Sequence, residues 1–589
     1  MKGPRNNQAP RTALAQLPFG AVQLRGLQGD QFHATQRFLL ELSTDAMLKP
    51  YRELAGLPAP GNDIGGWYDN FPTKWFGRGF APGHCLGQWI SALARGYAIT
   101  GAAAVKAKLA EVVHGYALAV SPKFYDDLRY PTYTYEKLVL GLLDARFLAG
   151  NEEALAALQA TTDAALHIIP DHPTMHGEPR PGRDVTYTWD EPYTVPETMF
   201  IAYRHGLGRR YLQMALRLIA DKDFFDRLAI GENVLSGKHA CSHVNALCSA
   251  AQAYLTLGSK KHLQATRNAF AMITAQSFAT GGWGPNELFV LPGSGGLGDS
   301  ISHTHRSFET PCGAYAHMKL TRYLLCITGN STYGDSMERV ILNTVLGAKP
   351  LQSDGRAFYY SDYQPGAKKV FHPDRCPCCA GSLPQATCEY HAGAYFTDKR
   401  GLLVNLYGPS SVTWTQQGAS FALTQSTKYP LSSLVRMRIS APKSRRLALR
   451  FRLPQWVKPG TAWLSVNGKR IHRALRPGNF ASLTRVWKDG DLIKLHLPLR
   501  FRLEPVDEQH PNMNALVRGP LVLFALGATP PAVTRAQLLA ARRNPRREDE
   551  WLVRTDGNVL HLRPFTAIDD EPYTTYLMIT DCTTMAPLS

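Results

Sequence analysis

Apolar residues repeat with two different periods along the chain, and the period changes near residue 400. Before that point they recur at helical spacing in segment after segment, and each segment predicts an amphipathic helix. The clear segments are Trp89–Thr100, Tyr135–Ala149, Glu153–Ile168, Thr198–His205, Tyr211–Ile219, Val244–Leu257, Lys261–Thr274, Ala314–Thr328 and Tyr333–Leu346. Helical pairs that return about every 50 residues predict an (α/α)6 barrel, and the long irregular loops between them disfavour the alternative, a superhelical solenoid.

After residue 400 the apolar period becomes two, which predicts short strands. They are Leu402–Tyr407, Ser411–Thr415, Val435–Ile439, Leu447–Phe451, Trp463–Val466 and Ile493–Leu497, with a further strand-rich stretch at Ala515–Leu526. Asn467-Gly468 predicts a hairpin turn, and Lys488-Asp-Gly-Asp491 predicts a second one. Short, regularly spaced strands indicate a β-sandwich. We therefore expect a helical barrel over residues 1–400, a β-sandwich over 401–510 and a second small β domain over 511–589.

The net charge is large, but it excludes few classes of function. Subtracting 47 acidic from 65 basic residues gives a net charge of +18. Lys and Arg are scattered and accompany no nucleic-acid motif, so we expect a solvated basic face and no nucleic-acid partner. No apolar run reaches the roughly 18 residues of a membrane span, which predicts no membrane insertion. The first twenty residues lack the apolar core of a signal peptide, and both a cytoplasmic and a periplasmic location stay open.

The cysteines supply the first candidate chemistry. The adjacent pair Cys378-Cys379 lies on a stretch bounded by Pro and Gly, where two thiols on a turn could face one metal ion. Zinc prefers four ligands from Cys, His and carboxylate. Glu309 and Cys312 are the best further candidates, because Cys312 would lie in the first turn of a helix, where the dipole favours a thiolate. An ordinary helix N-terminus and an unrelated Cys-rich loop are the alternative.

A second candidate is Glu287, which ends the Gly-rich segment Gly281-Gly-Trp-Gly-Pro-Asn-Glu287. A carboxyl beside apolar and aromatic residues can be partly desolvated, which raises its pKa toward the range that a general acid needs. A surface-loop glutamate is the alternative.

Aromatic and histidine side chains crowd the loops of the helical half. Aromatic rings stack on sugar rings and imidazoles hydrogen-bond to hydroxyl groups, which predicts substrate contacts, although His239 and His243 could instead be polar core residues. The candidates are Trp67, Trp75, His84, Tyr187, Trp189, His239 and His243.

At these motifs the chain resembles the bacterial β-L-arabinofuranosidases of glycoside hydrolase family 127 and its relative, family 146. The likeness spans most of the chain and includes a helix in which the family usually has His where this chain has Glu136. It is carried by the segments Leu86–Ala94, Tyr135–Asp144, Cys312–Arg322, Tyr333–Asn343 and Cys378–Ser382. One departure is that Thr310 and Pro311 separate Glu309 from Cys312, where the family usually has one residue.

The resemblance implies a catalytic (α/α)6 barrel with C-terminal β-sandwiches and a retaining glycosidase reaction on a plant or microbial glycan. It also implies Zn²⁺ held by Glu309, Cys312, Cys378 and Cys379, with Cys378 as the nucleophile and Glu287 as the acid/base. Glu136, with the aromatic and histidine residues named above, would then contact the carbohydrate. A homodimer and a monomer both stay open.

Two other functions compete with this interpretation. A polysaccharide lyase acting on an acidic polymer would suit the basic charge, but it leaves Cys378-Cys379 unexplained. A non-catalytic sugar-binding protein would use the zinc only to hold its fold.

Overall fold

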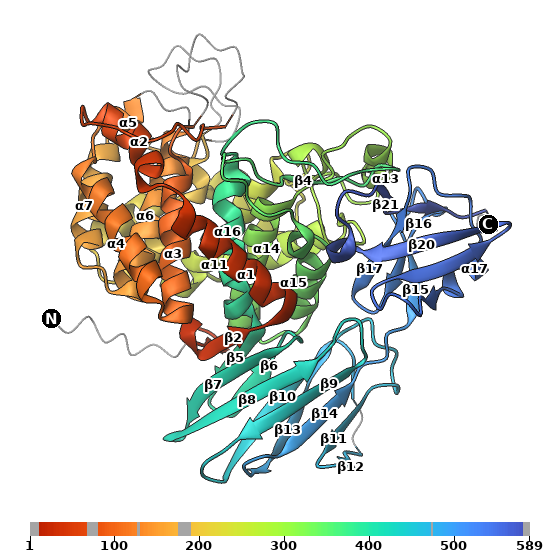
Figure 1. Cartoon of the computed structure of the whole chain (residues 1–589). Helices are drawn as coiled ribbons and strands as arrows, with labels where there is room; N and C mark the ends of the chain where they lie inside the picture. Colours follow the sequence, from red (N-terminus) through yellow and green to blue (C-terminus); the bar gives the residue numbers. More distant parts are fainter. Residues whose placement is uncertain (1–10, 68–80, 127–129, 175–189, 473–474, 581–589) are drawn as a thin grey trace.

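The computed structural model describes residues 11–67, 81–126, 130–174, 190–472 and 475–580. Helices dominate this part of the chain up to Ala394, and strands dominate after it (Figure 1). The change of period near residue 400 therefore marks the junction between a helical and a β-rich part.

Six of the described helices form a closed ring, because each contacts the next and the last contacts the first. These inner helices are α3 (Cys85–Thr100), α6 (Pro131–Ala149), α8 (Pro196–Arg204), α11 (Ala240–Leu257), α14 (Thr310–Thr328) and α16 (Cys378–Ala394). Each carries one outer helix, in the same order α4 (Ala103–Leu118), α7 (Glu153–Ala165), α9 (Arg209–Leu218), α12 (Lys260–Thr274), α15 (Thr332–Asn343) and α1 (Gly26–Glu41). This arrangement is the predicted (α/α)6 barrel.

Short helices lie between the longer helices of the barrel, and others lie in the β-rich part. They are α2 (Thr44–Leu54), α5 (Lys123–Asp126), α10 (Asp226–Ala229), α13 (Gly296–Ile301), α17 (Arg535–Leu539), η1 (Phe19–Ala21), η2 (Pro192–Thr194), η3 (Asp221–Phe225), η4 (Pro285–Glu287), η5 (Val345–Gly347) and η6 (Phe565–Ala567).

Small residues let the inner helices approach one another closely. A Cβ on Gly87 would lie 2.2 Å from the Lys137 carbonyl, and a Cβ on Gly141 would lie 2.2 Å from the Gly87 carbonyl oxygen. No side chain fits at that distance, so glycine at both positions sets the α3–α6 contact. Helix α16 is buried along its whole length.

Two sheets form the predicted β-sandwich. The first contains β1 (Ala15–Gln16), β5 (Tyr395–Asp398), β6 (Gly401–Val404), β10 (Arg445–Leu453) and β13 (Asn479–Trp487). The second contains β12 (Lys469–Arg470), β11 (Trp463–Val466), β14 (Leu492–His496), β9 (Leu434–Ser440), β8 (Ala419–Thr427), β7 (Ser410–Gln416) and β2 (Val22–Leu24). One apolar core joins both sheets to α14, α15 and α16, so the sandwich supports that side of the barrel.

One of the two predicted hairpin turns is correct. Asn467 and Gly468 have φ values of 50° and 82° and connect the antiparallel strands β11 and β12. The other prediction is wrong, because Lys488–Asp491 connects β13 and β14, which belong to different sheets. This turn carries the chain from one layer of the sandwich to the other.

A third sheet follows the sandwich and packs against η6 and the barrel loops. Its strands are β15 (Phe501–Pro505), β16 (Met513–Arg518), β17 (Leu521–Leu526), β20 (Asn558–Pro564), β19 (Trp551–Thr555), β18 (Arg542–Arg543), β21 (Tyr573–Thr574) and β22 (Leu577–Met578). Separately, β3 (Phe308–Glu309) pairs with β4 (Tyr360–Ser361) above the barrel. The division into three parts stays our proposal, with the third sheet starting at Phe501.

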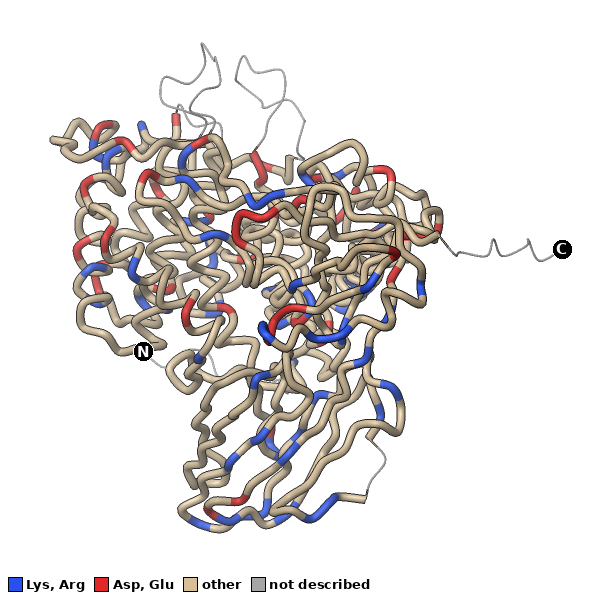
Figure 2. Tube along the Cα trace, turned by 45° about the vertical axis from the view of Figure 1, so that its right-hand side comes forward, with Lys and Arg blue, Asp and Glu red and all other residues tan. Residues whose placement is uncertain are grey.

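Acidic and basic residues are interspersed over the helical part, whereas the sandwich carries mostly Lys and Arg (Figure 2). Among the described residues, no helix combines the length and the apolar content that crossing a membrane requires.

Candidate active site

A cavity of about 300 Å³ lies where the N-terminal ends of the inner helices meet. Residues just before these helices and in their first turns line it, together with residues of later turns such as Glu136 and Lys319. The lining includes Trp67, Gln88, Tyr133, Glu136, Lys137, Glu191, His239, Cys241, Ser242, Glu287, Glu309, Cys312, Tyr315, Lys319, Cys378 and Ser382. Helix N-termini carry partial positive charge, so this end of the barrel favours carboxylate and thiolate groups.

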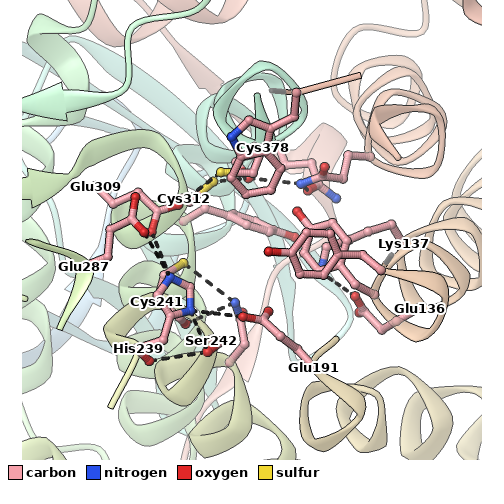
Figure 3. Close-up of a pocket in the computed structure, with 18 of the residues that line it drawn as sticks. Glu136, Lys137, Glu191, His239, Cys241, Ser242, Glu287, Glu309, Cys312 and Cys378 are labelled. Carbon is pink, nitrogen blue, oxygen red and sulfur yellow. Dashed lines mark hydrogen bonds and ion pairs between the residues drawn. The ribbon is translucent and has the colours of Figure 1, made fainter. Parts of the chain in front are cut away.

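Four potential metal ligands gather beside the cavity. Glu309, Cys312 and Cys378 line one of its walls (Figure 3), and Cys379 lies next to them. Glu309 precedes α14, Cys312 lies in the first turn of α14, and Cys378 and Cys379 begin α16. The first turn of α14 is where the sequence places Cys312. The sequence prediction of a turn around Cys378 is wrong, because the thiols start a long buried helix.

The geometry of the four groups fits one cation. Their ligand atoms all lie within 4.8 Å of one another. The Cys379 and Cys312 sulfurs are 3.5 Å apart, the Cys378 and Cys379 sulfurs are 4.0 Å apart, and Cys378 Sγ is 3.1 Å from Glu309 Oε1. Tetrahedral ligation at ~2.3 Å would separate two sulfurs by about 3.8 Å. The Glu309 carboxylate therefore lies beside the thiols despite the extra residue between Glu309 and Cys312.

Electrostatics also favour a bound cation here. Burial raises the pKa of the Cys312, Cys378 and Cys379 thiols well above its usual range. The buried Glu309 Oε2 accepts no hydrogen bond from the described residues, although His239 Nε2 lies 3.7 Å away. A metal ion would use the free lone pair and would deprotonate the thiols.

Glu287 reaches the same cavity from η4. Asn286 and Glu287 both adopt left-handed backbone conformations, with φ values of 53° and 64°. Tyr360 donates a hydrogen bond to Glu287 Oε1, and Glu287 Oε2 lies 4.0 Å from His239 Nε2. Burial, followed by the nearby Glu309 charge, raises the pKa of Glu287, which is the direction predicted from its desolvated setting.

His239 connects the carboxylates of the site. Its Nδ1 lies 3.0 Å from Glu191 Oε1 and 2.8 Å from Ser242 Oγ, while its Nε2 faces Glu287 and Glu309. Burial lowers the pKa of His239, but its interactions with the Glu191 and Glu309 carboxylates outweigh burial and raise the pKa well above its ordinary value. The imidazole therefore lies among three carboxylates, those of Glu191, Glu287 and Glu309.

Ion pairs build the opposite wall of the cavity. Glu136 accepts hydrogen bonds from Thr198 Oγ1 at 2.6 Å and from Lys137 Nζ at 2.5 Å. Deeper in the barrel, Lys319 Nζ donates to Glu197 Oε2 at 2.5 Å. Each of these charged side chains has a partner of opposite charge within the protein. They can therefore offer polar atoms to a ligand without an added ion.

Comparisons with known proteins identify the family. The domain signature described as "Beta-L-arabinofuranosidase, GH127 catalytic domain" matches residues 21–392, and the GH127 middle domain matches residues 401–499. The chain belongs to glycoside hydrolase family 127. This GH127 protein is therefore a glycoside hydrolase, and its substrate is a carbohydrate.

Solved structures of this GH127 fold superpose over nearly the whole chain. The β-arabinofuranosidase BT3674 is 16% identical, with a TM-score of 0.74 and coverage of 97% of this chain and 99% of that chain. Ara127N-Se, a β-L-arabinofuranosidase from Geobacillus stearothermophilus T6, is 17% identical, with a TM-score of 0.73 and coverage of 95% and 100%. A search of curated protein sequences finds no match.

Not every residue predicted to contact substrate lines the GH127 cavity. Trp67, Glu136 and His239 do. His84 is buried behind Trp67, with its Nδ1 2.7 Å from the Ala81 carbonyl oxygen. His243 packs against Tyr193 and Phe224. Neither His84 nor His243 is among the residues that line the cavity, and both are buried. Trp75, Tyr187 and Trp189 lie outside the described residues.

Several lining residues were missed by sequence reasoning. Cys241 places another thiol in the cavity, and Tyr359 OH lies 3.4 Å from Cys378 Sγ. Lys137, Glu191 and Lys319 were also missed. Lys137 directly follows Glu136, so the position of Glu136 alone could have indicated it, but no local pattern marks the others.

Proposed function

We propose that this family member is a retaining β-L-arabinofuranosidase that acts on plant or microbial glycans. Cys378 would be the nucleophile and Glu287 the acid/base. The observation that carries the proposal is that a thiol in a ligand set of three cysteines and one glutamate shares a cavity with a glutamate whose pKa is raised.

Glu309, Cys312, Cys378 and Cys379 would hold Zn²⁺, since three sulfurs and one carboxylate are a ligand set that zinc accepts. When bound, the ion keeps the Cys378 sulfur deprotonated at neutral pH, where burial alone would leave it a neutral thiol. Cys312, Cys379 and Glu309 supply ligands besides the reacting sulfur.

In the first step, Cys378 Sγ attacks the anomeric carbon while protonated Glu287 donates its proton to the glycosidic oxygen. The carbon–oxygen bond breaks, and a carbon–sulfur bond forms. In the second step, the Glu287 carboxylate takes a proton from water, whose oxygen attacks the same carbon and releases the Cys378 sulfur. Two displacements at one carbon restore the original anomeric configuration.

The other lining residues would bind and orient the sugar. Trp67 offers an aromatic face, while Glu136 and His239 offer hydrogen-bonding groups to the hydroxyls. The charged side chains are paired, which suits a neutral ligand with many hydroxyl groups.

The test begins with p-nitrophenyl glycosides, including the β-L-arabinofuranoside, assayed with and without a chelator. Proton NMR of the first-formed sugar should show the anomeric form of the substrate. An inverted product would mean that water attacks directly. Mass spectrometry after reaction with a haloacetamide sugar mimic should place the adduct on Cys378, and an adduct on Cys376 would contradict the assignment. Release of an unsaturated uronide absorbing near 235 nm would indicate a lyase instead.

A further inference from the structure

We propose that Tyr360 is a positioning residue that fixes the Glu287 carboxyl and determines which of its oxygens carries the reactive proton. This inference rests on the proposed role of Glu287 as acid/base. It adds a residue that neither the sequence motifs nor the ligand set of the metal site indicates.

The backbone around Tyr360 is fastened to the metal-ligand segment. Strand β4 pairs with β3 so that Tyr360 lies opposite Glu309. The Thr310 amide donates to the Tyr359 carbonyl at 2.7 Å, and the Ser361 amide donates to Thr310 Oγ1 at 2.9 Å. Any displacement of β4 would therefore also disturb the start of α14, where Glu309 and Cys312 lie.

The Tyr360 hydroxyl donates to Glu287 Oε1. Glu287 needs such a partner, because it stands on a short left-handed segment, a conformation that costs energy for residues other than glycine. The Asn286 amide donates to the Arg306 carbonyl at 2.7 Å and holds the backbone of that segment. Tyr360 is the group that holds the side chain.

An oxygen that accepts a hydrogen bond is a poor site for the proton of the same carboxyl group. With Oε1 occupied by Tyr360, the proton of the acid form is placed on Oε2, the oxygen on the side of His239. A phenol ordinarily has a pKa of about 10, so the Tyr360 hydroxyl is a donor at neutral pH. The same Oε2 would later take the proton from water.

The neighbouring tyrosine strengthens the geometric argument. Tyr359 OH lies 3.4 Å from Cys378 Sγ, and the Tyr359 and Tyr360 ring centroids are 4.4 Å apart. Consecutive residues of one short segment thus contact the proposed nucleophile and the proposed acid/base. Strand β4 is suited to fix the separation between these two groups, on which a retaining mechanism depends.

The test is a double-mutant cycle with Tyr360→Phe and Glu287→Gln, measured on aryl glycosides with good and poor leaving groups. Phenylalanine keeps the ring and removes only the hydroxyl. Tyr360→Phe should lower kcat/KM by roughly 10- to 100-fold on a poor leaving group, the size expected for a hydrogen bond to a charged group. With a very good leaving group the loss should be at most about threefold, because little protonation is needed.

In the background of Glu287→Gln, adding Tyr360→Phe should cost at most about twofold, because the two residues act as a unit. The matched control is Tyr363→Phe, which removes another buried hydroxyl, bonded to Thr280 Oγ1 at 2.5 Å and outside the cavity lining. It should show no dependence on the leaving group. Metal content and melting temperature confirm that each variant is folded.

Equal losses on all leaving groups, or additive losses in the cycle, would overturn the positioning role while leaving Glu287 as the acid. If Glu287→Gln itself keeps normal activity on poor leaving groups, the acid/base assignment fails, and the role of Tyr360 fails with it.

Discussion

The two walls of the cavity contrast in how their polar groups are satisfied. On the cysteine wall (Glu309, Cys312, Cys378 and Cys379), three thiols crowd one carboxylate whose Oε2 accepts no hydrogen bond from the described residues. On the ion-pair wall (Glu136, Lys137 and Lys319), Lys137 pairs with Glu136, and Lys319 pairs with Glu197 behind the wall. Both walls are buried in one barrel, so the contrast does not come from solvent exposure.

Buried polar groups cost free energy unless they have partners, so the two walls suggest different tasks. The cysteine wall leaves a buried carboxylate oxygen without a hydrogen bond from the described residues, which suits a bound cation. The ion-pair wall is complete, and in the proposed function it would offer hydrogen bonds to a sugar. Perturbing the first wall should therefore affect the chemistry, and perturbing the second should affect stability and substrate binding.

Metal removal should have the largest effect, because it breaks the cysteine wall as a whole. Protein purified without chelator should contain about one zinc per chain by elemental analysis. Dialysis against a chelator under reducing conditions should abolish activity and lower the melting temperature, since an ion present at 100 times its Kd stabilises the fold by about 2.7 kcal/mol. Readdition of zinc should restore both. A metal content well below half an equivalent would contradict the prediction.

Replacement of the proposed nucleophile should have the next largest effect. Cys378→Ser should reduce kcat/KM by roughly 10³-fold or more, because the reacting sulfur is lost while the chain stays folded. Cys376→Ser is the matched control, since the Cys376 sulfur contacts Cys85 Sγ at 3.8 Å and lies outside the metal-ligand group. It should keep activity within about threefold. Similar losses in both variants would point to a structural role for this whole segment.

The fold could be predicted to the extent that each helix or strand has one apolar face. Helices α11, α12 and α14 were predicted to within a few residues, and so was the change to strands. Helix α16 was missed, because it is buried all round and contains Gly381 and Pro384, so no polar face produces a helical period. The pairing of β1 and β2 with strands far along the chain has no local signal.

The candidate site was predictable where residue types are unusual and close in sequence. Cys378-Cys379 and Glu309-Thr-Pro-Cys312 stand out because adjacent thiols and a carboxylate near a helix start are uncommon. Tyr359 and Tyr360 gave no such signal, since their place at the site depends on the pairing of β4 with β3, some fifty residues earlier in the chain. His239 and His243 looked equivalent at their spacing, yet only His239, which precedes α11, lines the cavity.

Loss of a charge from the ion-pair wall should affect stability more than chemistry. Lys319→Met leaves Glu197 buried without its ionic partner, which should lower the free energy of unfolding by about 3–5 kcal/mol. The control is Lys261→Met, because Lys261 forms ion pairs with Asp221 and Asp226 but its side chain is 39% exposed. That change should cost about 1 kcal/mol or less. Urea unfolding measures both, and equal costs would contradict the distinction.

The smallest effect should come from Glu136→Gln, which tests whether the ion-pair wall binds substrate. Glutamine can still accept the hydrogen bond from Thr198, so the fold should tolerate the change, but Lys137 loses its counterion. Among the described residues, the Glu136 side chain hydrogen-bonds to Thr198 and Lys137, and neither belongs to the proposed reacting groups. An interaction that is equally strong in the ground state and the transition state changes KM and leaves kcat unchanged. We therefore expect KM to rise by roughly 3- to 10-fold, the size of a weakened hydrogen bond, with kcat within about twofold.

The control for this prediction is Glu152→Gln, at an exposed residue paired with Arg146, which should change neither constant. Glu136→His introduces the residue that the family usually has, and it should alter the ratio of kcat/KM values between two glycosides. A fall in kcat for Glu136→Gln at constant KM would show instead that this wall acts in the transition state, and the division of tasks between the two walls would be wrong.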